Sequence, residues 1–256
     1  MAVRRIGIIG AGVIGQSVYR EIVASGLGEV AYVLVSAVRP RAGMPDAFNA
    51  AMTADIEQAL SQPVDLVVEA AHPEVLSSIA GRVLERGDLC GFSCAALARP
   101  ETEEVIARTT RRAGTRFYLP HGAVLGLDGL ADGRDSIDEV RITTVKSDLG
   151  LGLPSGSSGV MFDGPTRQAC LRFPRNVNVH AALAMAGIGF DRTRSVIVAE
   201  PGLAEMRHRI EVRGAGMAWD ISVSSRSLGG VSGAYTPRSA AGSVRRILGG
   251  SGVLNV

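Results

Sequence analysis

Cysteine is scarce in this sequence, and long apolar runs are absent from it. Only three cysteines, Cys90, Cys94 and Cys170, occur in 256 residues, and so odd and widely spaced a set does not form a disulfide framework. Cys90 and Cys94 also lack a second pair of ligands, so we expect no zinc site. No apolar run approaches the ~18 residues of a membrane span, and no small-residue cleavage site follows the apolar start. We therefore expect a cytoplasmic protein that does not bind membranes.

An excess of charge of either sign is also missing. The 27 basic and 25 acidic residues leave a formal net charge of +2, and no block of like charge is long enough to bind nucleic acid. Lysine occurs once, at Lys146, so any chemistry that requires a lysine must use this position. Hydrophobic residues nevertheless make up 46% of the chain, enough for a full core, and the length fits one large domain or two small ones.

The first 120 residues alternate short apolar runs with segments of helical period. This alternation predicts a parallel sheet covered by helices on both faces, the doubly wound α/β arrangement of a Rossmann domain. The expected strands are 3–9, 30–35, 64–68, 89–92 and 116–119. The expected helices include 13–26, 74–86 and 101–113.

A different pattern begins after Pro120. The strands expected here are 139–146, 194–199, 207–213 and 217–224. A glycine- and serine-rich loop is expected at 149–159, one helix over 164–190, and a last helix at 237–248. These elements indicate an α+β domain with a mainly antiparallel sheet and helices on one side of it.

The strongest motif lies between the first strand and the first helix. It is the sequence Gly10-Ala11-Gly12-Val13-Ile14-Gly15. Gly10 permits a tight turn, Gly12 lets the backbone approach a pyrophosphate, and Gly15 allows the helix to pack closely on the strand. The free N–H groups and the partial positive charge at the helix N-terminus favour an anion. The motif therefore predicts that these six residues bind a dinucleotide, NADP or NAD.

The end of the second strand bears on the choice between the two nucleotides. An acidic residue at this point binds the ribose of NAD, but the chain has Ser36 there, followed by Arg39 and Arg41. No carboxylate would repel a 2′-phosphate, so we expect NADP to be accepted, with Arg39 or Arg41 on its phosphate. The alternative is that both arginines are ordinary solvated surface residues.

The remaining candidates come from a strand end and from the histidines. Ala70, Ala71 and His72 follow the expected strand 64–68, where an open parallel sheet forms its cofactor crevice. His72 is equally compatible with a helix cap or with the surface. His208 lies on the apolar face of an alternating strand. It is either part of a pocket wall, where it can transfer protons, or a half-buried core histidine.

Several segments resemble the L-aspartate dehydrogenase family. They are Ile6 to Gly15, Asp65 to Ala71, Tyr118 to Leu130, Arg172 to Val179 and His208 to Gly214. The most specific is Phe173-Pro174-Arg175-Asn176-Val177-Asn178-Val179, because ordinary fold physics does not demand two asparagines at the start of an apolar helix. The resemblance implies NAD(P)-dependent oxidation of L-aspartate through iminosuccinate to oxaloacetate and ammonia, or the reverse reductive amination.

The resemblance also implies roles for single residues. Ala123 and Asn178 correspond to cofactor contacts, and His208 corresponds to the active-site histidine. A dicarboxylate substrate requires cations, for which Lys146 and Arg238 are the candidates. A histidine that titrates near neutrality can take the proton of the substrate amine or activate water.

The resemblance further implies two domains and a homodimer. Residues 1–120 form the expected nucleotide domain together with a returning helix at about 237–256, and residues 121–236 form the expected substrate and dimerisation domain. The chain departs from the family at His121, where a small hydroxyl residue is expected, and in a glycine- and serine-rich loop at 224–238. Two alternatives stay open: a related amino-acid dehydrogenase or imine reductase with a different substrate, and a non-catalytic NADP-binding sensor.

Overall fold

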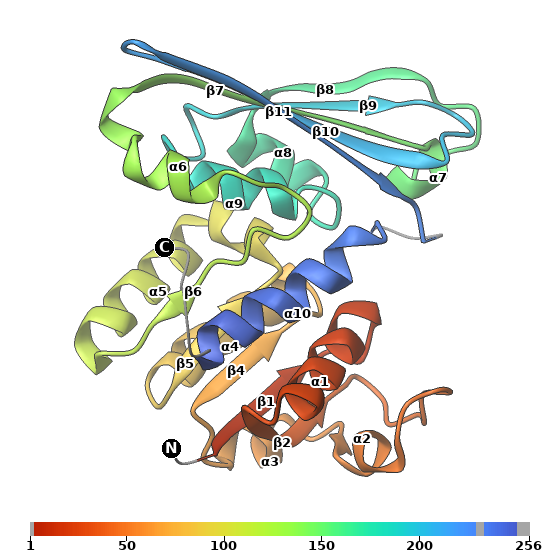
Figure 1. Ribbon diagram of the computed structural model, residues 1–256, viewed down its shortest axis with the longest axis vertical. Coiled ribbons are helices and arrows are strands. Elements are labelled where there is room, and N and C mark those ends of the chain that lie inside the picture. The colour runs from red at the N-terminus through yellow and green to blue at the C-terminus, as the bar shows by residue number, and fades with distance from the viewer. Residues whose placement is uncertain (1–2, 229–232, 250–256) are drawn as a thin grey trace. The chain divides into compact units, whose positions relative to one another are not determined.

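The computed structural model describes residues 3–228 and 233–249, which form two compact units. Unit 1 contains residues 3–93, 100–120 and 237–249, and unit 2 contains residues 94–99, 121–228 and 233–236. Each unit has its own sheet and its own hydrophobic core (Figure 1). Parts of the expected loop and of the expected C-terminal segment, 229–232 and 250–256, lie outside the described residues.

Unit 1 is built on a six-stranded sheet. The strands are β1 (Arg4–Ile9), β2 (Gly28–Leu34), β3 (Met52–Thr53), β4 (Leu66–Glu69), β5 (Asp88–Gly91) and β6 (Phe117–Tyr118). Their order is β3-β2-β1-β4-β5-β6, and all neighbours run parallel. The chain proceeds outward from β1 to β3 and then returns to β4, beside β1. Ligands bind at such a reversal point in open α/β sheets, and the predicted Rossmann arrangement is confirmed.

The first and the last described helices pack in the core of unit 1. Its helices are α1 (Val13–Ser25), α2 (Asp46–Ala50), α3 (Ile56–Ser61), α4 (Pro73–Leu84), α5 (Pro100–Ala113) and, from Pro237 onward, α10 (Tyr235–Leu248). Val18 of α1 and Val244 of α10 are fully buried in one cluster with Ile8 of β1. Ser17 Oγ also donates to the Pro237 carbonyl at 2.8 Å. The last helix therefore completes the fold of the first unit.

Unit 2 is built on a five-stranded mixed sheet. Its strands are β7 (Ile137–Lys146), β8 (Gly159–Pro165), β9 (Arg194–Ala199), β10 (Glu205–Gly214) and β11 (Met217–Arg226), in the order β11-β10-β7-β9-β8. β7 and β9 run parallel, and the other neighbours are antiparallel, as the mainly antiparallel prediction requires. Along β10 buried and exposed side chains alternate, so one face of the sheet is turned to the core.

The single helix expected over 164–190 is wrong. The chain instead completes β8 at Pro165 and forms two helices, α8 (Thr166–Arg172) and α9 (Asn178–Ala186). Phe173 leaves the helical region, with φ −129° and ψ 52°, and Pro174 has no N–H to continue the hydrogen-bond ladder. The apolar period is continuous across this break, which is why it reads as one helix.

Short helical segments complete unit 2. They are η1 (Cys94–Ala98), α6 (Leu127–Asp132), η2 (Arg134–Ser136) and α7 (Asp148–Leu151). The residues of η1 lie within the 1–120 segment that the sequence assigns to the nucleotide domain, but they pack on α8 and α9. In the part of the chain that the structure describes, no helix is both long enough and apolar enough to cross a membrane.

Candidate functional site

The turn between β1 and α1 has the conformation and the space that a pyrophosphate requires. Gly10 has a φ of +102°, and a Cβ there would lie 2.5 Å from the Ala70 carbonyl oxygen, so only glycine fits. A Cβ at Gly15 would meet the Gly10 carbonyl oxygen. Gly12, in contrast, has no atom within 4 Å of its Cβ position. Gly12 is the N-cap of α1, and among the described residues no side chain caps that helix and no acidic residue lies in its first turn. Its N–H groups therefore fit an anion such as the diphosphate of NAD(P).

The other three residues of the motif differ in their exposure. Ala11 is buried in the core cluster of unit 1, and Ile14 is half-buried against that cluster. Val13 is 54% exposed. Since the phosphate contacts of such a turn come from the backbone, these side chains set the packing of the turn rather than its chemistry.

The end of β2 presents hydroxyl and guanidinium groups. Ser36 and Arg39 are exposed, and Arg41 is half-buried, with its main-chain N–H donating to Asn49 Oδ1 at 2.8 Å. Arg41 Nε is buried and, within the described ranges, has no hydrogen-bond partner. Residues 35–45 contain no carboxylate. This composition is compatible with a 2′-phosphate at the end of β2.

A buried carboxylate, Glu69, holds the end of β4. Glu69 Oε1 accepts hydrogen bonds from the Ala71 N–H at 2.7 Å and the Ser93 hydroxyl at 2.8 Å, and Oε2 accepts from the Ser93 N–H at 3.1 Å. Burial raises the pKa of Glu69 to about 7, although these hydrogen bonds oppose the rise. Ala70 and Ala71 are half-buried, and His72 is the exposed N-cap residue of α4, without a capping hydrogen bond from its side chain. Glu69 thus fixes the turn that carries all three predicted residues.

In unit 2, His208 and Lys146 share one buried face of the sheet. His208 on β10 pairs directly with Thr144 on β7, and Lys146 follows Thr144 by two residues. The exposed fractions of His208, Thr144 and Lys146 are only 3%, 1% and 3%. Ile142 and Ile210 continue the same face into the hydrophobic core. The face is therefore apolar at one end and polar at the other.

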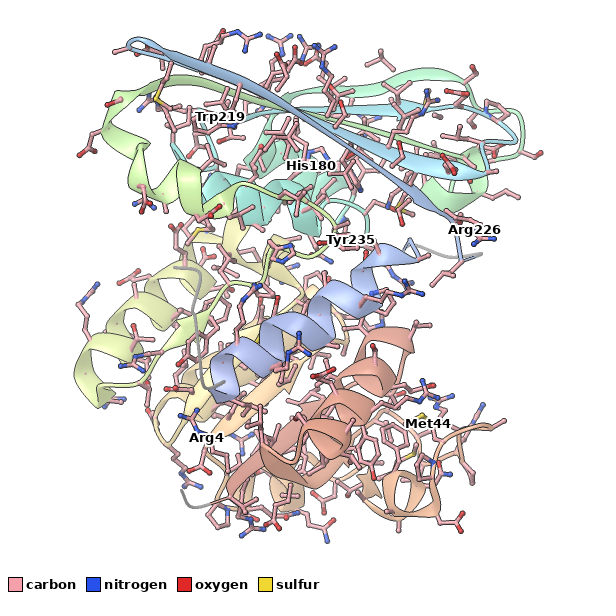
Figure 2. The ribbon with its side chains drawn as sticks, viewed as in Figure 1. Arg4, Met44, His180, Trp219, Arg226 and Tyr235 are labelled. Carbon is pink, nitrogen blue, oxygen red and sulfur yellow. The ribbon has the colours of Figure 1, made fainter. Side chains whose placement is uncertain are left out.

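His208 begins a chain of five hydrogen bonds that ends at a main-chain carbonyl. The links are His208 Nδ1 to Thr144 Oγ1 (2.8 Å), Thr144 Oγ1 to His180 Nε2 (2.6 Å), His180 Nδ1 to Ser195 Oγ (2.8 Å), Ser195 Oγ to Thr166 Oγ1 (2.7 Å) and Thr166 Oγ1 to the Thr193 carbonyl (3.0 Å). All six residues are buried. His180, labelled in Figure 2, extends from α9 toward the sheet.

Burial keeps both imidazoles neutral. It lowers the pKa of His208 to about 3, with the positive charge of Lys146 as a second cause. The pKa of His180 lies well below its ordinary value because of burial and the charges of His208 and Lys146. Each ring therefore carries one proton and one lone pair at neutral pH.

Lys146 is a buried cation with an oriented partner. Burial lowers the pKa of Lys146 to about 8. Its Nζ donates to Asn176 Oδ1 at 3.2 Å, while Asn176 Nδ2 donates to the Leu151 carbonyl at 3.2 Å. This second bond turns the amide oxygen of Asn176 toward the ammonium. Lys146 is thus a desolvated positive charge near His208, and such a charge attracts a carboxylate.

Asn178 and Ala123 also lie in unit 2. Asn178 is the first residue of α9, and its Oδ1 accepts the Ala95 N–H at 3.1 Å. Ala123 is buried in a turn in which His121 Nδ1 donates to the Val124 carbonyl at 2.8 Å. His121, a departure from the family pattern, thus closes this turn.

The remaining predicted cation and the cysteines are placed differently. Arg238 is exposed on α10 and belongs to unit 1, whereas Lys146 belongs to unit 2.

All three cysteines are buried free thiols. The described residues contain no group of three or more His, Cys, Asp or Glu side chains that could hold a metal ion.

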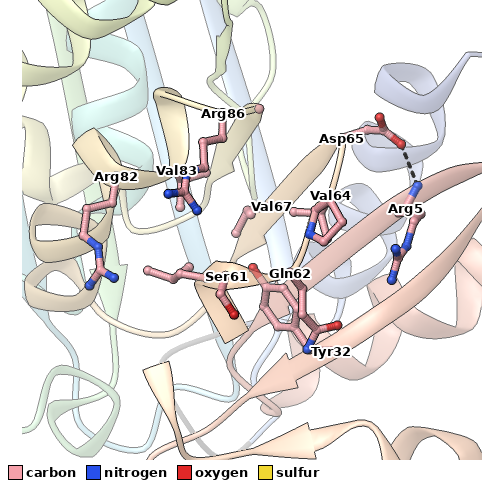
Figure 3. A pocket seen from close by; sticks show the side chains of 13 residues that line it. Arg5, Tyr32, Ser61, Gln62, Val64, Asp65, Val67, Arg82, Val83 and Arg86 are labelled. Carbon is pink, nitrogen blue, oxygen red and sulfur yellow. Dashed lines mark hydrogen bonds between the residues drawn. The ribbon is translucent and has the colours of Figure 1, made fainter. Parts of the chain in front are cut away.

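A separate cavity of about 410 Å³ lies at the amino ends of β1, β4 and β5. Figure 3 shows Tyr32, Arg82 and Arg86 around it, and a hydrogen bond from the Arg5 N–H to Asp65 at its rim. None of the predicted site residues lines this cavity. Open α/β sheets bind ligands at the carboxyl ends of their strands, so this cavity lies at the wrong edge for the nucleotide.

The sequence analysis did not identify several polar residues at the end of β4 and in the hydrogen-bond chain of unit 2. They are Glu69, Thr144, Thr166, His180 and Ser195. Two signals could have found some of them: Glu69 interrupts an apolar strand, and Thr144 lies two residues from the only lysine. No local pattern connects His180 with the strands it contacts, because its partners are 36 and 15 residues away.

Two family models match consecutive parts of the chain. Residues 128–247 match the family model "Aspartate dehydrogenase, C-terminal", and residues 10–120 match "Homoserine dehydrogenase, NAD binding domain". An L-aspartate dehydrogenase of Methanosarcina mazei is 34% identical over 227 residues, covering 82% of this chain and 83% of that protein. L-aspartate dehydrogenase 2 of Bordetella bronchiseptica is 34% identical over 223 residues, with the same coverage.

Solved structures show a similar fold. The crystal structure of aspartate dehydrogenase from Thermotoga maritima has a TM-score of 0.78 at 24% identity, covering 99% of this chain and 100% of that chain. A hyperthermophilic archaeal homoserine dehydrogenase in complex with NADPH has a TM-score of 0.59 at 10% identity, covering 96% and 97%. At these identities the two structures support the fold alone.

Proposed function

The chain belongs to the L-aspartate dehydrogenase family, and we infer from this that it oxidises L-aspartate to oxaloacetate and ammonia through iminosuccinate. It is an oxidoreductase that acts on a CH–NH₂ group with NAD or NADP. The observation that carries this conclusion is the extent of the likeness to the curated relatives, which covers 82% of the chain. These relatives favour aspartate over the two alternatives, another amino-acid or imine substrate and a non-catalytic sensor.

We propose that Lys146 binds a carboxylate of the substrate. A buried ammonium attracts an anion far more strongly than an exposed one, because little water screens it. The Asn176 amide orients the Lys146 ammonium, and a dicarboxylate would compensate the buried charge. Arg238 is the second proposed cation for the substrate.

We propose that His208 Nε2 takes the proton of the substrate ammonium. The amine must be neutral before its lone pair can form the C=N bond of the imine as the Cα–H leaves with its electron pair. A bound dinucleotide would supply the hydride acceptor, its nicotinamide ring. Water then adds to the imine carbon, and ammonia leaves to give oxaloacetate. A base near the substrate nitrogen can accept the proton of the ammonium and, once it has released that proton, the proton of the attacking water.

The proposed cofactor contacts come from several segments of the chain. The backbone of Gly10 to Gly15 binds the diphosphate, and the segment from Ala70 to His72 lines the crevice at the end of β4. Arg39 contacts the 2′-phosphate of NADP. Ala123 and the Asn178 amide contact the nicotinamide half. The free space at Gly12 supports the first of these assignments.

An assay with purified protein tests the activity. Reduction of NAD and of NADP is followed by nicotinamide absorbance with L-aspartate and with a panel of other amino acids. Oxidation of the reduced forms is followed with oxaloacetate and other 2-oxo acids plus ammonia. We expect aspartate and oxaloacetate to give the highest kcat/KM, and a higher value for another substrate pair would contradict the assignment to aspartate.

Replacement of His208 tests its proposed role as the proton acceptor. His208→Asn should lower kcat by about 10²–10⁴-fold and leave the cofactor KM unchanged, as expected for loss of a general base. Arg209→Gln is the control, because Arg209 is the next residue on β10 and lies on the exposed face of that strand, opposite the buried face that carries His208. A His208→Asn enzyme with more than a tenth of the normal kcat would contradict this role.

Comparison of the two nucleotides tests Arg39. Arg39→Ala should raise the KM for NADP about tenfold or more and leave that for NAD unchanged, since a phosphate contact contributes to NADP alone. Arg20→Ala is the control, because this residue is also exposed in unit 1 but interacts with the Gly43 carbonyl instead. Equal effects on both nucleotides would contradict the contact.

We further propose a cytoplasmic homodimer. The buried free thiols support a reducing compartment. One face of the unit 2 sheet carries α8 and α9, and the other face is open in Figure 1, which leaves surface for a second copy. Sedimentation equilibrium at micromolar concentration should give twice the 26.7 kDa chain mass, and a single-chain mass would contradict the dimer.

A further inference from the structure

The hydrogen-bond chain behind His208 has a fixed direction, because one of its ends cannot donate. The Thr193 carbonyl is an acceptor only, so Thr166 must give its one hydroxyl proton to it. Ser195 then has to donate to Thr166, and the Ser195 oxygen is left to accept from His180 Nδ1. This fixes the proton of His180 on Nδ1.

The direction continues through His180 to His208. Because the imidazole of His180 is neutral, its Nε2 holds a lone pair and accepts the Thr144 hydroxyl proton. The Thr144 oxygen must then accept from His208 Nδ1. His208 therefore carries its proton on Nδ1 and a lone pair on Nε2. The reverse arrangement with neutral rings would lose the bond from the Thr166 hydroxyl to the Thr193 carbonyl and leave the lone pairs of these two oxygens facing each other at 3.0 Å.

We propose that His180, with Ser195 and Thr166 behind it, is a positioning residue that holds His208 in the tautomer whose Nε2 can accept a proton. The role of His208 in this statement rests on the proposed function, whereas the tautomer itself does not. His180 does not touch the reacting atoms; it acts through Thr144. A triad carboxylate orients its histidine in the same manner, and loss of the correct tautomer there costs several orders of magnitude in rate.

The register of the sheet accounts for the first link of the chain only. Thr144 and His208 are direct partners on neighbouring strands, and their side chains meet without help. A threonine hydroxyl alone could donate to His208 Nδ1 or accept from it, so Thr144 sets no direction. The direction comes from the first residue of α8 and the residue just before β9, because the Thr193 carbonyl accepts both the N–H and the hydroxyl of Thr166.

A single substitution at the far end should reverse the whole chain. In Thr166→Val the Ser195 hydroxyl loses its acceptor and is free to donate to His180 Nδ1. The proton of His180 then moves to Nε2 and is donated to Thr144, and Thr144 donates to His208 Nδ1. His208 is left with its proton on Nε2, the wrong atom for a proton acceptor.

Two matched controls separate this effect from loss of packing. Thr166→Ser keeps the hydroxyl and should keep the direction. Thr193→Val removes a buried hydroxyl that, among the described residues, has no hydrogen-bond partner, and it leaves the Thr193 carbonyl in place. Both variants change the same region of unit 2 without breaking the chain.

The tautomer is read by NMR of protein labelled with ¹⁵N in its four histidines, with His208→Asn to assign the signals. We expect the Nδ1–H form of His208 in the natural protein and in both controls, and the Nε2–H form in Thr166→Val. The Nε2–H form in the natural protein, or an unchanged tautomer in Thr166→Val, would overturn the proposal. Should Thr166→Val fail to fold, Ser195→Ala breaks the next link and should give a mixture of both tautomers; an unchanged Nδ1–H form would then overturn it.

Kinetics test the consequence for the reaction. In Thr166→Val we expect kcat for aspartate to fall about tenfold or more, with the cofactor KM unchanged. Full activity with a reversed tautomer would overturn the positioning role. Absence of aspartate oxidation in the natural protein, with the tautomers as expected, would instead contradict the proposed function and leave the directed chain in place.

Discussion

Replacement of Lys146 by methionine should stabilise the protein while it removes the proposed substrate cation. Lys146 is only 3% exposed, and burial lowers its pKa from 10.5 to about 8. At about 1.36 kcal/mol per pH unit, this difference corresponds to about 3 kcal/mol of unfavourable free energy at pH 7. The variant leaves Asn176 Oδ1 without its donor, which costs about 1–2 kcal/mol. The free energy of unfolding should therefore rise by about 1–2 kcal/mol.

The pH dependence of this gain identifies its cause. Below pH 8 the folded and the unfolded protein both carry the Lys146 proton, and the penalty is fully present. Between pH 8 and 10.5 the folded protein releases the proton and the unfolded chain keeps it, so the natural protein regains stability as the pH rises. By pH 9.5 about 2 kcal/mol of the penalty has disappeared, and the advantage of Lys146→Met should shrink by that amount.

Urea unfolding at pH 7 and pH 9.5 measures both quantities. The fluorescence of Trp219, the only tryptophan, reports on unit 2, where its ring packs against the core. Arg207→Met is the control, because Arg207 is an exposed cation on the neighbouring strand β10 and its removal relieves no burial. The reasoning would be refuted if Lys146→Met were less stable than the natural protein at pH 7 and the difference between the two free energies of unfolding were the same at pH 9.5.

Three further perturbations test other parts of the structure. Gly12→Asp should raise the KM for both nucleotides at least tenfold at an unchanged Tm, since its Cβ has free space and its charge would face the diphosphate; a lowered Tm would contradict the open turn. Between pH 6.5 and pH 3 the free energy of unfolding, measured by urea titration, should fall by several kcal/mol, because His208 takes up a proton in the unfolded chain but stays neutral in the folded protein. A free energy of unfolding that does not change over this pH range would contradict the burial of His208. Asp55→Ala should cost about 1 kcal/mol, because Asp55 Oδ1 caps α3 through the N–H groups of Glu57 and Gln58 at 2.9 and 3.0 Å; a calorimetric Tm equal to that of the natural protein would contradict it.

The nucleotide-binding unit could be predicted because its signals are local. The turn from Gly10 to Gly15 joins an apolar strand to an amphipathic helix, and every property of that turn depends on residues close in sequence. The fold of the second unit was harder to predict, because its strand pairing joins residues that are far apart in the sequence. The strand β8 lies in a segment that reads as loop and helix, and its pairing with β9 over about 35 residues leaves no local mark. The break at Pro174 was visible, but the apolar period across it was the stronger pattern.

The candidate site follows the same distinction. His208 and Lys146 could be singled out by residue type and strand alternation. Thr144 and His180 could not be singled out in this way, because their role depends on the register of β7 with β10 and on the packing of α9 against the sheet. A histidine in an apolar helix gives no indication of which hydroxyl it will contact.

The charge of Lys146 contributes to the protonation behaviour of His208, and a bound dicarboxylate would change that contribution. With no anion present, the charge of Lys146 helps to lower the pKa of His208, which makes the imidazole a weak base. A carboxylate beside Lys146 cancels that charge, so the pKa of His208 should rise when substrate binds, by the part of the lowering that Lys146 causes; the larger part, which burial causes, remains. Succinate, an unreactive dicarboxylate, should therefore raise the pKa of His208 in an NMR titration of histidine-labelled protein. An unchanged pKa of His208 at saturating succinate would show that the charge of Lys146 does not govern this imidazole.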